Sequence, residues 1–115
     1  MVSAEDVRRF AMSLPRTELH VIRDQVKFRV GRLVYAAISR DETSMGFGFP
    51  KEERAALVAA EPEKFHLPVA SDLRYHWVRV WLAAIDEEEM RELVLDAWRM
   101  VVPKRVAAEW LRQHG

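Results

Sequence analysis

The chain has 115 residues, of which 50% are hydrophobic and 31% charged, with 18 Lys and Arg balanced by 18 Asp and Glu. This size and composition are typical of one soluble globular domain with its own hydrophobic core. There is no cysteine and no run of about 18 apolar residues, which excludes disulfides, thiolate zinc sites, cysteine nucleophiles and a transmembrane helix. The first residues lack the apolar core of a signal peptide, so we expect a cytoplasmic domain.

The neutral total hides blocks of like charge. Residues 16–40 hold six basic and two acidic side chains, whereas residues 41–63 hold two basic and six acidic ones. A nucleic-acid partner is compatible with this balance if the basic blocks share a face. Strong non-specific binding is disfavoured, because it needs several uncompensated phosphate contacts.

The first half of the chain reads as one helix followed by a meander of strands. Ser3 is a good helix N-cap, and Leu14-Pro15 ends the helix because a residue before proline avoids the helical region. Gly31-Arg32 indicates a tight hairpin turn. The expected strands span residues 18–23, 25–30, 33–39 and 43–49.

The second half is dominated by one strand and one long helix. A helix over residues 50–60 and a crossing loop over 62–75 precede an alternating strand over 76–84. Asp86 caps a long amphipathic helix, whose buried stripe extends to Val101 and which Pro103 ends. A short terminal helix is expected over residues 104–113.

This order predicts an α+β fold, a single domain over residues 1–115, with an antiparallel sheet and helices packed on one face. The other face of the sheet is then the surface of interest. Small side chains are expected there from Ser44, Gly46 and Gly48. The large or charged side chains expected on that face come from Lys27, Arg29, Tyr35, Trp77, Arg79 and Trp81.

Aromatic side chains beside cations suggest a nucleic-acid interface. Trp77 and Trp81 could stack bases while Arg79 holds phosphate. The alternative is that the C-terminal segment or a second copy of the chain buries these indoles, as is usual for side chains of this size.

The other candidate cations have equally plain structural explanations. Lys27, Arg29 and Arg32 resemble a basic wing, although charge on an edge strand also prevents aggregation. Lys104 and Arg105 could bind phosphate, or they could neutralise carbonyls at the end of the long helix.

No pattern predicts catalysis or metal binding. The four histidines are dispersed, and only Glu61, Glu63 and His66 could converge on a metal from one loop. There is no nucleophile elbow, phosphate loop or dinucleotide fingerprint. We therefore expect no cofactor, no metal and no enzyme activity.

The C-terminal half resembles the MmcQ/YjbR-like family of small bacterial proteins. That family's pattern joins a His-Trp strand to a helix with a late tryptophan and a Pro-Lys-Arg end. The N-terminal half agrees more loosely, through Ser13–Pro15, Lys27–Val30 and a Gly-Arg turn. The matching residues are His76, Trp77, Val80, Leu82, Asp86, Glu89, Leu93, Ala97, Trp98, Pro103, Lys104 and Arg105.

The resemblance implies an antiparallel α+β fold similar to secretion chaperones or frataxin, and DNA binding through a double-wing arrangement. Two departures lie in loops: Arg16 replaces a common glycine, and residues 71–75 lack the usual glycine-containing loop. Because both departures lie in loops, they affect which ligand contacts the resemblance implies for this chain more than they affect the implied fold.

The leading hypothesis is a non-catalytic domain that binds DNA and exists as a monomer or weak homodimer. The alternative is a protein-interaction or self-association module that uses the outer sheet face. A small-ligand pocket on that face is a third possibility. The candidate nucleic-acid-binding residues are Lys27, Arg29, Arg32, Arg40, Arg74, Trp77, Arg79, Trp81, Lys104 and Arg105.

Overall fold

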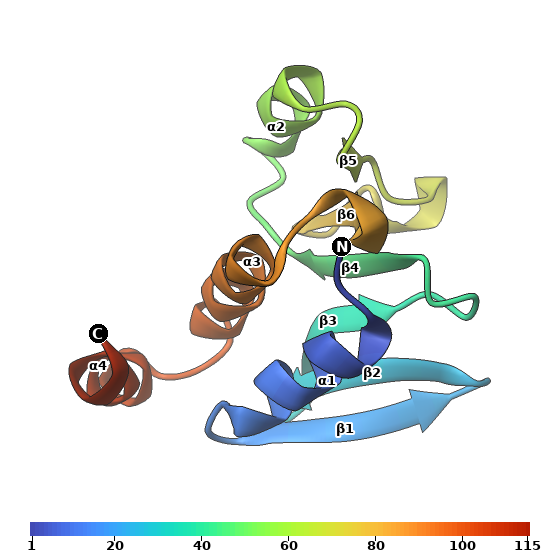
Figure 1. Cartoon of the computed structure of the whole chain (residues 1–115). Coiled ribbons are helices and arrows are strands. Elements are labelled where there is room, and N and C mark those ends of the chain that lie inside the picture. Colours follow the sequence, from blue (N-terminus) through green and yellow to red (C-terminus); the bar gives the residue numbers. More distant parts are fainter.

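A computed structural model describes all residues from 1 to 115 and shows an antiparallel sheet of six strands in the order β1-β2-β3-β4-β6-β5 (Figure 1). The sheet and four α-helices form one compact α+β domain, as predicted. Two short 3-10 helices, η1 (Ala70–Asp72) and η2 (Leu82–Ala84), flank β6. The strands are β1 (Thr17–Ile22), β2 (Gln25–Val30), β3 (Leu33–Ile38), β4 (Ser44–Gly48), β5 (Phe65–His66) and β6 (Trp77–Trp81). The helices are α1 (Ala4–Ser13), α2 (Arg54–Ala60), α3 (Glu87–Arg99) and α4 (Lys104–His114).

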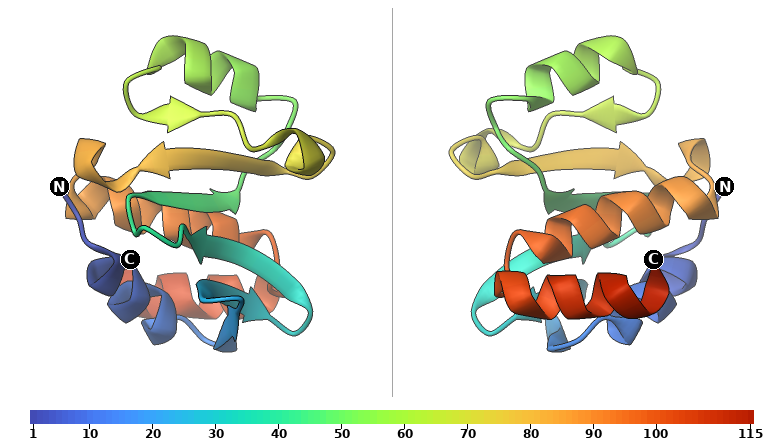
Figure 2. Two further views of the ribbon diagram at one scale, coloured as in Figure 1. Left: turned by 90° about the vertical axis from the view of Figure 1, so that its right-hand side faces the viewer. Right: turned by 90° about the vertical axis from the view of Figure 1, so that its left-hand side faces the viewer.

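The helices cover one face of the sheet and leave the other open. Figure 2 shows the strands in front in one view, and α3 and α4 in front of them in the opposite view. The helix α2 lies beside the edge strand β5 instead of on a face (Figure 2). No helix has the length and apolar character needed to cross a membrane.

Predicted caps begin the two helices that line the core. The Ser3 hydroxyl accepts a hydrogen bond from the Asp6 backbone N–H, and the Asp6 carboxylate accepts one from the Ser3 backbone N–H. Asp86 accepts a hydrogen bond from the Glu89 backbone at 2.8 Å. These bonds satisfy amide groups that the first turn of a helix otherwise leaves free.

The alternation predicted for β6 is confirmed. Val78 and Val80 are fully buried against the helix layer, whereas the side chain of Trp81 is 41% exposed on the other face. Met45 and Phe47 of β4 lie opposite the two valines and are also buried. The indole of Trp98 packs within the same core and donates to the Pro15 carbonyl at 2.9 Å.

The expectation for Tyr35 was wrong, because this side chain faces the helices. β3 contains a bulge: Phe28 pairs with Ala36 and Arg29 pairs with Val34, so Tyr35 has no partner on β2. An extra residue in one strand reverses the alternation beyond it. The Tyr35 hydroxyl meets Thr17 Oγ1 at 2.8 Å, and burial raises the pKa of Tyr35 to about 12 although the Thr17 hydrogen bond lowers it.

The ends of β6 and α3 and the direction of Gly48 also differ from the expectations. β6 ends at Trp81, and η2 follows where the strand was expected to continue. α3 ends at Arg99, so Val101 lies in the turn between helices and Pro103 caps α4. A Cβ on Gly48 would contact Ala97 and Met100, so the empty side of Gly48 faces α3 instead of the open face.

Candidate binding groove

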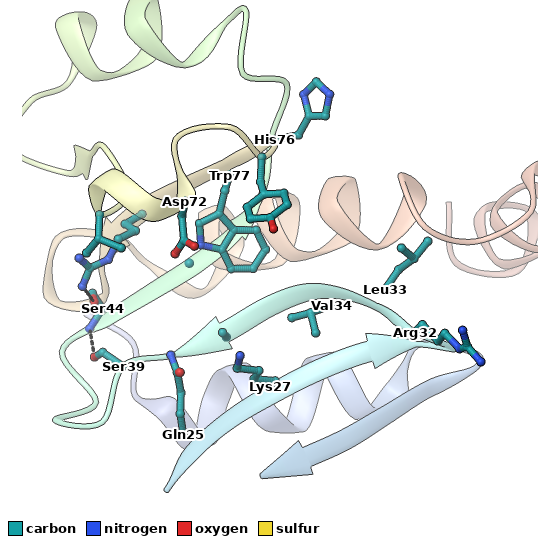
Figure 3. Close-up of a pocket in the computed structure, with 15 residues that line it drawn as sticks. Gln25, Lys27, Arg32, Leu33, Val34, Ser39, Ser44, Asp72, His76 and Trp77 are labelled. Atoms are coloured by element: carbon teal, nitrogen blue, oxygen red, sulfur yellow. Dashed lines mark hydrogen bonds between the residues drawn. The ribbon is translucent and has the colours of Figure 1, made fainter. Parts of the chain in front are cut away.

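The open face of the sheet is hollowed into a groove of about 760 Å³. Its floor comes from β3 and β4, and its walls come from β2 and from the segment that leads through η1 into β6. Figure 3 shows Trp77 on one side, Lys27 and Gln25 on the other, and Arg32 and Leu33 at one end. The size lies within the usual range of small-ligand pockets.

A single register row crosses the sheet through the groove. Lys27 pairs with Ala37, Ala37 with Gly46, and Gly46 with Arg79. Residues directly opposite one another in antiparallel strands point to the same face. The row therefore places Lys27 and Arg79 at the two sides of a floor that is formed by Ala37 and Gly46.

A series of hydrogen bonds through Ser44 and Ser39 holds the Arg79 side chain in place. Its Nη2 donates to Ser44 Oγ at 3.0 Å, and Ser44 is 1% exposed. The Ser44 backbone donates to Ser39 Oγ at 3.0 Å, and Ser39 Oγ donates to Asp41 Oδ1 at 2.8 Å. One nitrogen of the guanidinium is thus used for orientation, while its other donors make no hydrogen bond.

The indole of Trp77 lies over Gly46. A Cβ added at Gly46 would stand 2.5 Å from Trp77 Nε1, which is closer than real Cβ contacts allow. A larger residue at position 46 would therefore displace the ring. Glycine here brings a broad aromatic surface down onto the groove floor.

Arg54 of α2 fixes the chain that leads into β6. Its guanidinium donates to the carbonyls of Tyr75 at 2.9 Å and Trp77 at 3.3 Å, and also to the carbonyl of Leu73. Nearby, the Lys51 backbone donates to His76 Nδ1 at 3.0 Å. These contacts hold the groove wall, which has no regular secondary structure after η1.

The groove lining holds three cations and one carboxylate, so its net charge is positive. Lys27, Arg32 and Arg79 each lack an Asp or Glu oxygen within 4.0 Å, and Asp72 lines the same groove without pairing with any of them. In contrast, Arg8 and Arg91 on the helices are paired with glutamates. A groove with unpaired cations attracts anionic ligands.

A second aromatic surface lies at the other end of β6. His66 stacks on Trp81 with ring centroids 4.3 Å apart. Neither ring nitrogen of His66 has a hydrogen-bond partner, and burial followed by the nearby Arg79 charge lowers the pKa of His66. His66 therefore covers one face of the Trp81 ring.

The structure brings four of the ten candidate residues together, namely Lys27, Arg32, Trp77 and Arg79. Trp81 lies on β6 with Trp77 and Arg79, and Arg29 lies on β2 with Lys27, but neither Trp81 nor Arg29 lines the groove. Glu18 Oε1 lies 3.9 Å from Arg29 Nε, and that nitrogen is buried without a hydrogen bond.

The remaining four candidates lie elsewhere. Arg74 is exposed at the edge of the wall, with its guanidinium over the Tyr75 ring at 4.8 Å. Arg40 lines a smaller pocket near the start of α1. Lys104 and Arg105 begin α4 on the side of the sheet that the helices cover (Figure 2).

Several groove residues were missed in the sequence. Asp72 and Tyr75 belong to a segment expected to be only a crossing loop, His76 was expected only to begin the last strand, and Arg54 belongs to an ordinary helix. Composition gave no signal for them, because a loop's path over a sheet depends on tertiary contacts. The structure also does not bring Glu61, Glu63 and His66 together as metal ligands; Glu61 pairs with Lys64 at 3.1 Å instead.

Comparisons with known proteins agree with the architecture. The model of the YjbR family matches residues 12–100 of the chain. The crystal structure of Deinococcus radiodurans protein DR2400, which carries domain DUF419, is similar with a TM-score of 0.74 and 22% identity. The match covers 87% of this chain and 78% of that one, and shows a shared fold. No curated protein is significantly similar in sequence. The family match spans the sheet, the groove and α3, and the chain therefore belongs to the YjbR family.

Proposed function

We propose that the groove binds single-stranded nucleic acid, with DNA as the first ligand to test, and that the protein acts by binding without catalysis. The observation that supports this most is Trp77 lying over Gly46 among cations that have no carboxylate partner. Proteins that bind single strands combine aromatic surfaces, on which bases stack, with positive charge along the backbone path.

The position of Trp81 adds to the support. Trp81 lies four positions after Trp77 along β6, which corresponds to about 13 Å in an extended strand. Both side chains face away from the helices. A strand that lies along β6 would meet one indole near each end.

Titration of labelled single-stranded and double-stranded DNA at 50 and 200 mM salt tests the proposal. We expect single strands to bind more tightly than duplexes, and binding to weaken as salt rises because counterions are released. Trp77→Ala should weaken binding about tenfold or more, since stacking of one base contributes about 1–3 kcal/mol. Absence of single-strand binding at 50 mM salt would refute the proposal.

A second candidate function is protein interaction through the same face. Val69, Tyr75 and Trp81 are 54%, 51% and 41% exposed around the groove. Aromatic residues and arginine are enriched at the centres of interfaces. Light scattering over a concentration series would detect self-association, and a monomer at high concentration would remove the homodimer version.

A further inference from the structure

Building on the proposed function, we propose that the groove holds one base between its two flanking phosphates. The base stacks on Trp77, one phosphate binds Arg79, and the other binds Lys27. The minimal ligand is then a nucleotide with a phosphate on each side, and not a long polymer or a duplex.

The register row sets the distance between the two phosphate contacts. Lys27 and Arg79 lie three strand spacings apart in the same row, through Ala37 and Gly46. At about 4.8 Å per spacing, their Cα atoms are about 14 Å apart. The Lys27 side chain is long enough to reach inward over Ala37, and the Arg79 guanidinium is held beside Ser44, two residues from Gly46 on β4. A ligand over the row therefore meets a cation on each side.

The indole occupies the space between these cations. Trp77 itself pairs with Gly48, but its ring leans along the strand and covers Gly46, which belongs to the row. Figure 3 shows the Trp77 ring across the groove from Lys27. A base on this ring therefore has one phosphate directed toward Arg79 and the next toward Lys27.

The two phosphate contacts differ in character. Arg79 is oriented by Ser44 and keeps free donors in a fork that suits a phosphate. The Lys27 ammonium has no hydrogen-bond or ion-pair partner within the chain, so it offers a phosphate a point charge. Arg79 should consequently contribute more than Lys27 to affinity.

Arg32 lies too far along the sheet to share these phosphates. Arg32 lies five positions after Lys27 in the chain, and a strand rises about 3.3 Å per residue. Its place at the β2–β3 turn, at one end of the groove, is shown in Figure 3. Arg32 should therefore matter only for longer oligonucleotides.

A duplex cannot present this arrangement, because each of its bases is already stacked on both faces. Single strands leave base faces free for aromatic side chains. Selectivity for single strands thus follows from the stacking contact, whereas the phosphate contacts alone would accept either form.

Calorimetric titrations with thymidine, TpT, TpTpT and an eight-residue oligo(dT) over a range of salt test the inference. TpTpT supplies the central base with two phosphates, so its log K should be higher than that of TpT and should fall more steeply with log salt. Thymidine should bind far more weakly than either, with little dependence on salt.

Three variants separate the contacts. Arg79→Gln and Lys27→Gln should each make the slope for TpTpT shallower than the wild-type slope, with the larger loss of affinity for Arg79→Gln. Arg105→Gln removes the same charge from the helix-covered side and should leave both slope and affinity unchanged. Circular dichroism of each variant confirms that it is folded before titration.

The outcomes distinguish this inference from the proposed function. If the eight-residue oligo(dT) does not bind the wild type, both are refuted. If it binds, but TpTpT gains nothing over TpT or the Arg79→Gln slope equals the wild-type slope, only the one-base, two-phosphate arrangement is refuted.

Discussion

At the scale of single residues, Gly46 determines what the groove can contain. Gly46→Ala would place a methyl group 2.5 Å from Trp77 Nε1, so the ring must move off the floor. We expect unfolding free energy to fall by about 1 kcal/mol or more, because filling occupied space is destabilising. Single-strand affinity should fall with it, since stacking depends on the position of the ring.

Gly48 offers a matched control in the same strand. A Cβ there would lie 3.5 Å from Met100 Sδ, an ordinary van der Waals distance. Gly48→Ala should therefore leave the tryptophan emission spectrum and single-strand affinity near wild-type values. Equal behaviour of the two alanine variants would contradict the assigned role of Gly46.

His66 should make stability depend on pH. Burial, and then the Arg79 charge, lower the pKa of His66 below its usual 6.5 in the folded state. The unfolded chain consequently binds a proton first as pH falls, and folding loses stability between pH 6.5 and the lower folded pKa. Above pH 6.5 this contribution is fully present.

Comparison of the wild type with His66→Phe isolates that contribution. Phenylalanine retains a ring that can stack on Trp81 at the 4.3 Å spacing but does not titrate. Urea denaturation at pH 7.5, 6.0 and 5.0 should show a smaller loss of stability with acid for His66→Phe. A parallel loss in both proteins would show that His66 does not titrate in this range.

At the scale of elements, α2 supports the groove without entering it. Arg54 donates to the carbonyls of Leu73, Tyr75 and Trp77, so one side chain ties a helix to the groove wall. Arg54→Met should lower the unfolding free energy by about 1 kcal/mol, because the partly buried Trp77 carbonyl loses a donor, whereas the exposed carbonyls of Leu73 and Tyr75 can bind water instead. Amide hydrogen exchange should become faster in residues 69–77.

Arg54→Lys provides the sharper comparison. Lysine keeps the charge but cannot reproduce the planar fork that reaches several carbonyls. We expect Arg54→Lys to restore little of the protection against amide hydrogen exchange that Arg54→Met removes. Full rescue by lysine would show that charge, and not the shape of the guanidinium, holds the wall.

The elements also show which parts of the fold the sequence could predict. β6 and α3 were predictable because alternation and the Asp86 cap are local signals. Tyr35 was not, because a bulge changes the face of a residue without changing the pattern of residue types. The contribution of Asp72 and Tyr75 to the groove depends on how a loop crosses the sheet, and no local pattern records that path.

The candidate site was partly predictable for the same reason. Trp77 and Arg79 alternate with buried valines, so their face could be read from the chain. The alignment of Lys27 with Arg79 requires the pairing of four strands, which a single sequence does not specify. Lys104 and Arg105 were grouped with them by charge alone, and the fold separates them from the groove.

At the scale of the whole molecule, the zero net charge conceals an uneven distribution. Arg8, Arg91 and Arg112 on the helices pair with glutamates within the same helix. Such pairs change stability little but neutralise the surface on which they lie. The groove cations Lys27, Arg32 and Arg79 have no such partners, so the groove keeps a net positive charge that attracts anions.

Mapping a single-stranded ligand onto the protein tests this account most directly. Amide and indole resonances of the labelled protein should be followed by NMR during titration with oligo(dT) at 50 mM salt. We expect the largest shifts at Trp77 Nε1–H and at the amides of Lys27, Gly46 and Arg79, with little change in α4. Shifts centred on Lys104 and Arg105, or no shifts at any residue, would contradict it.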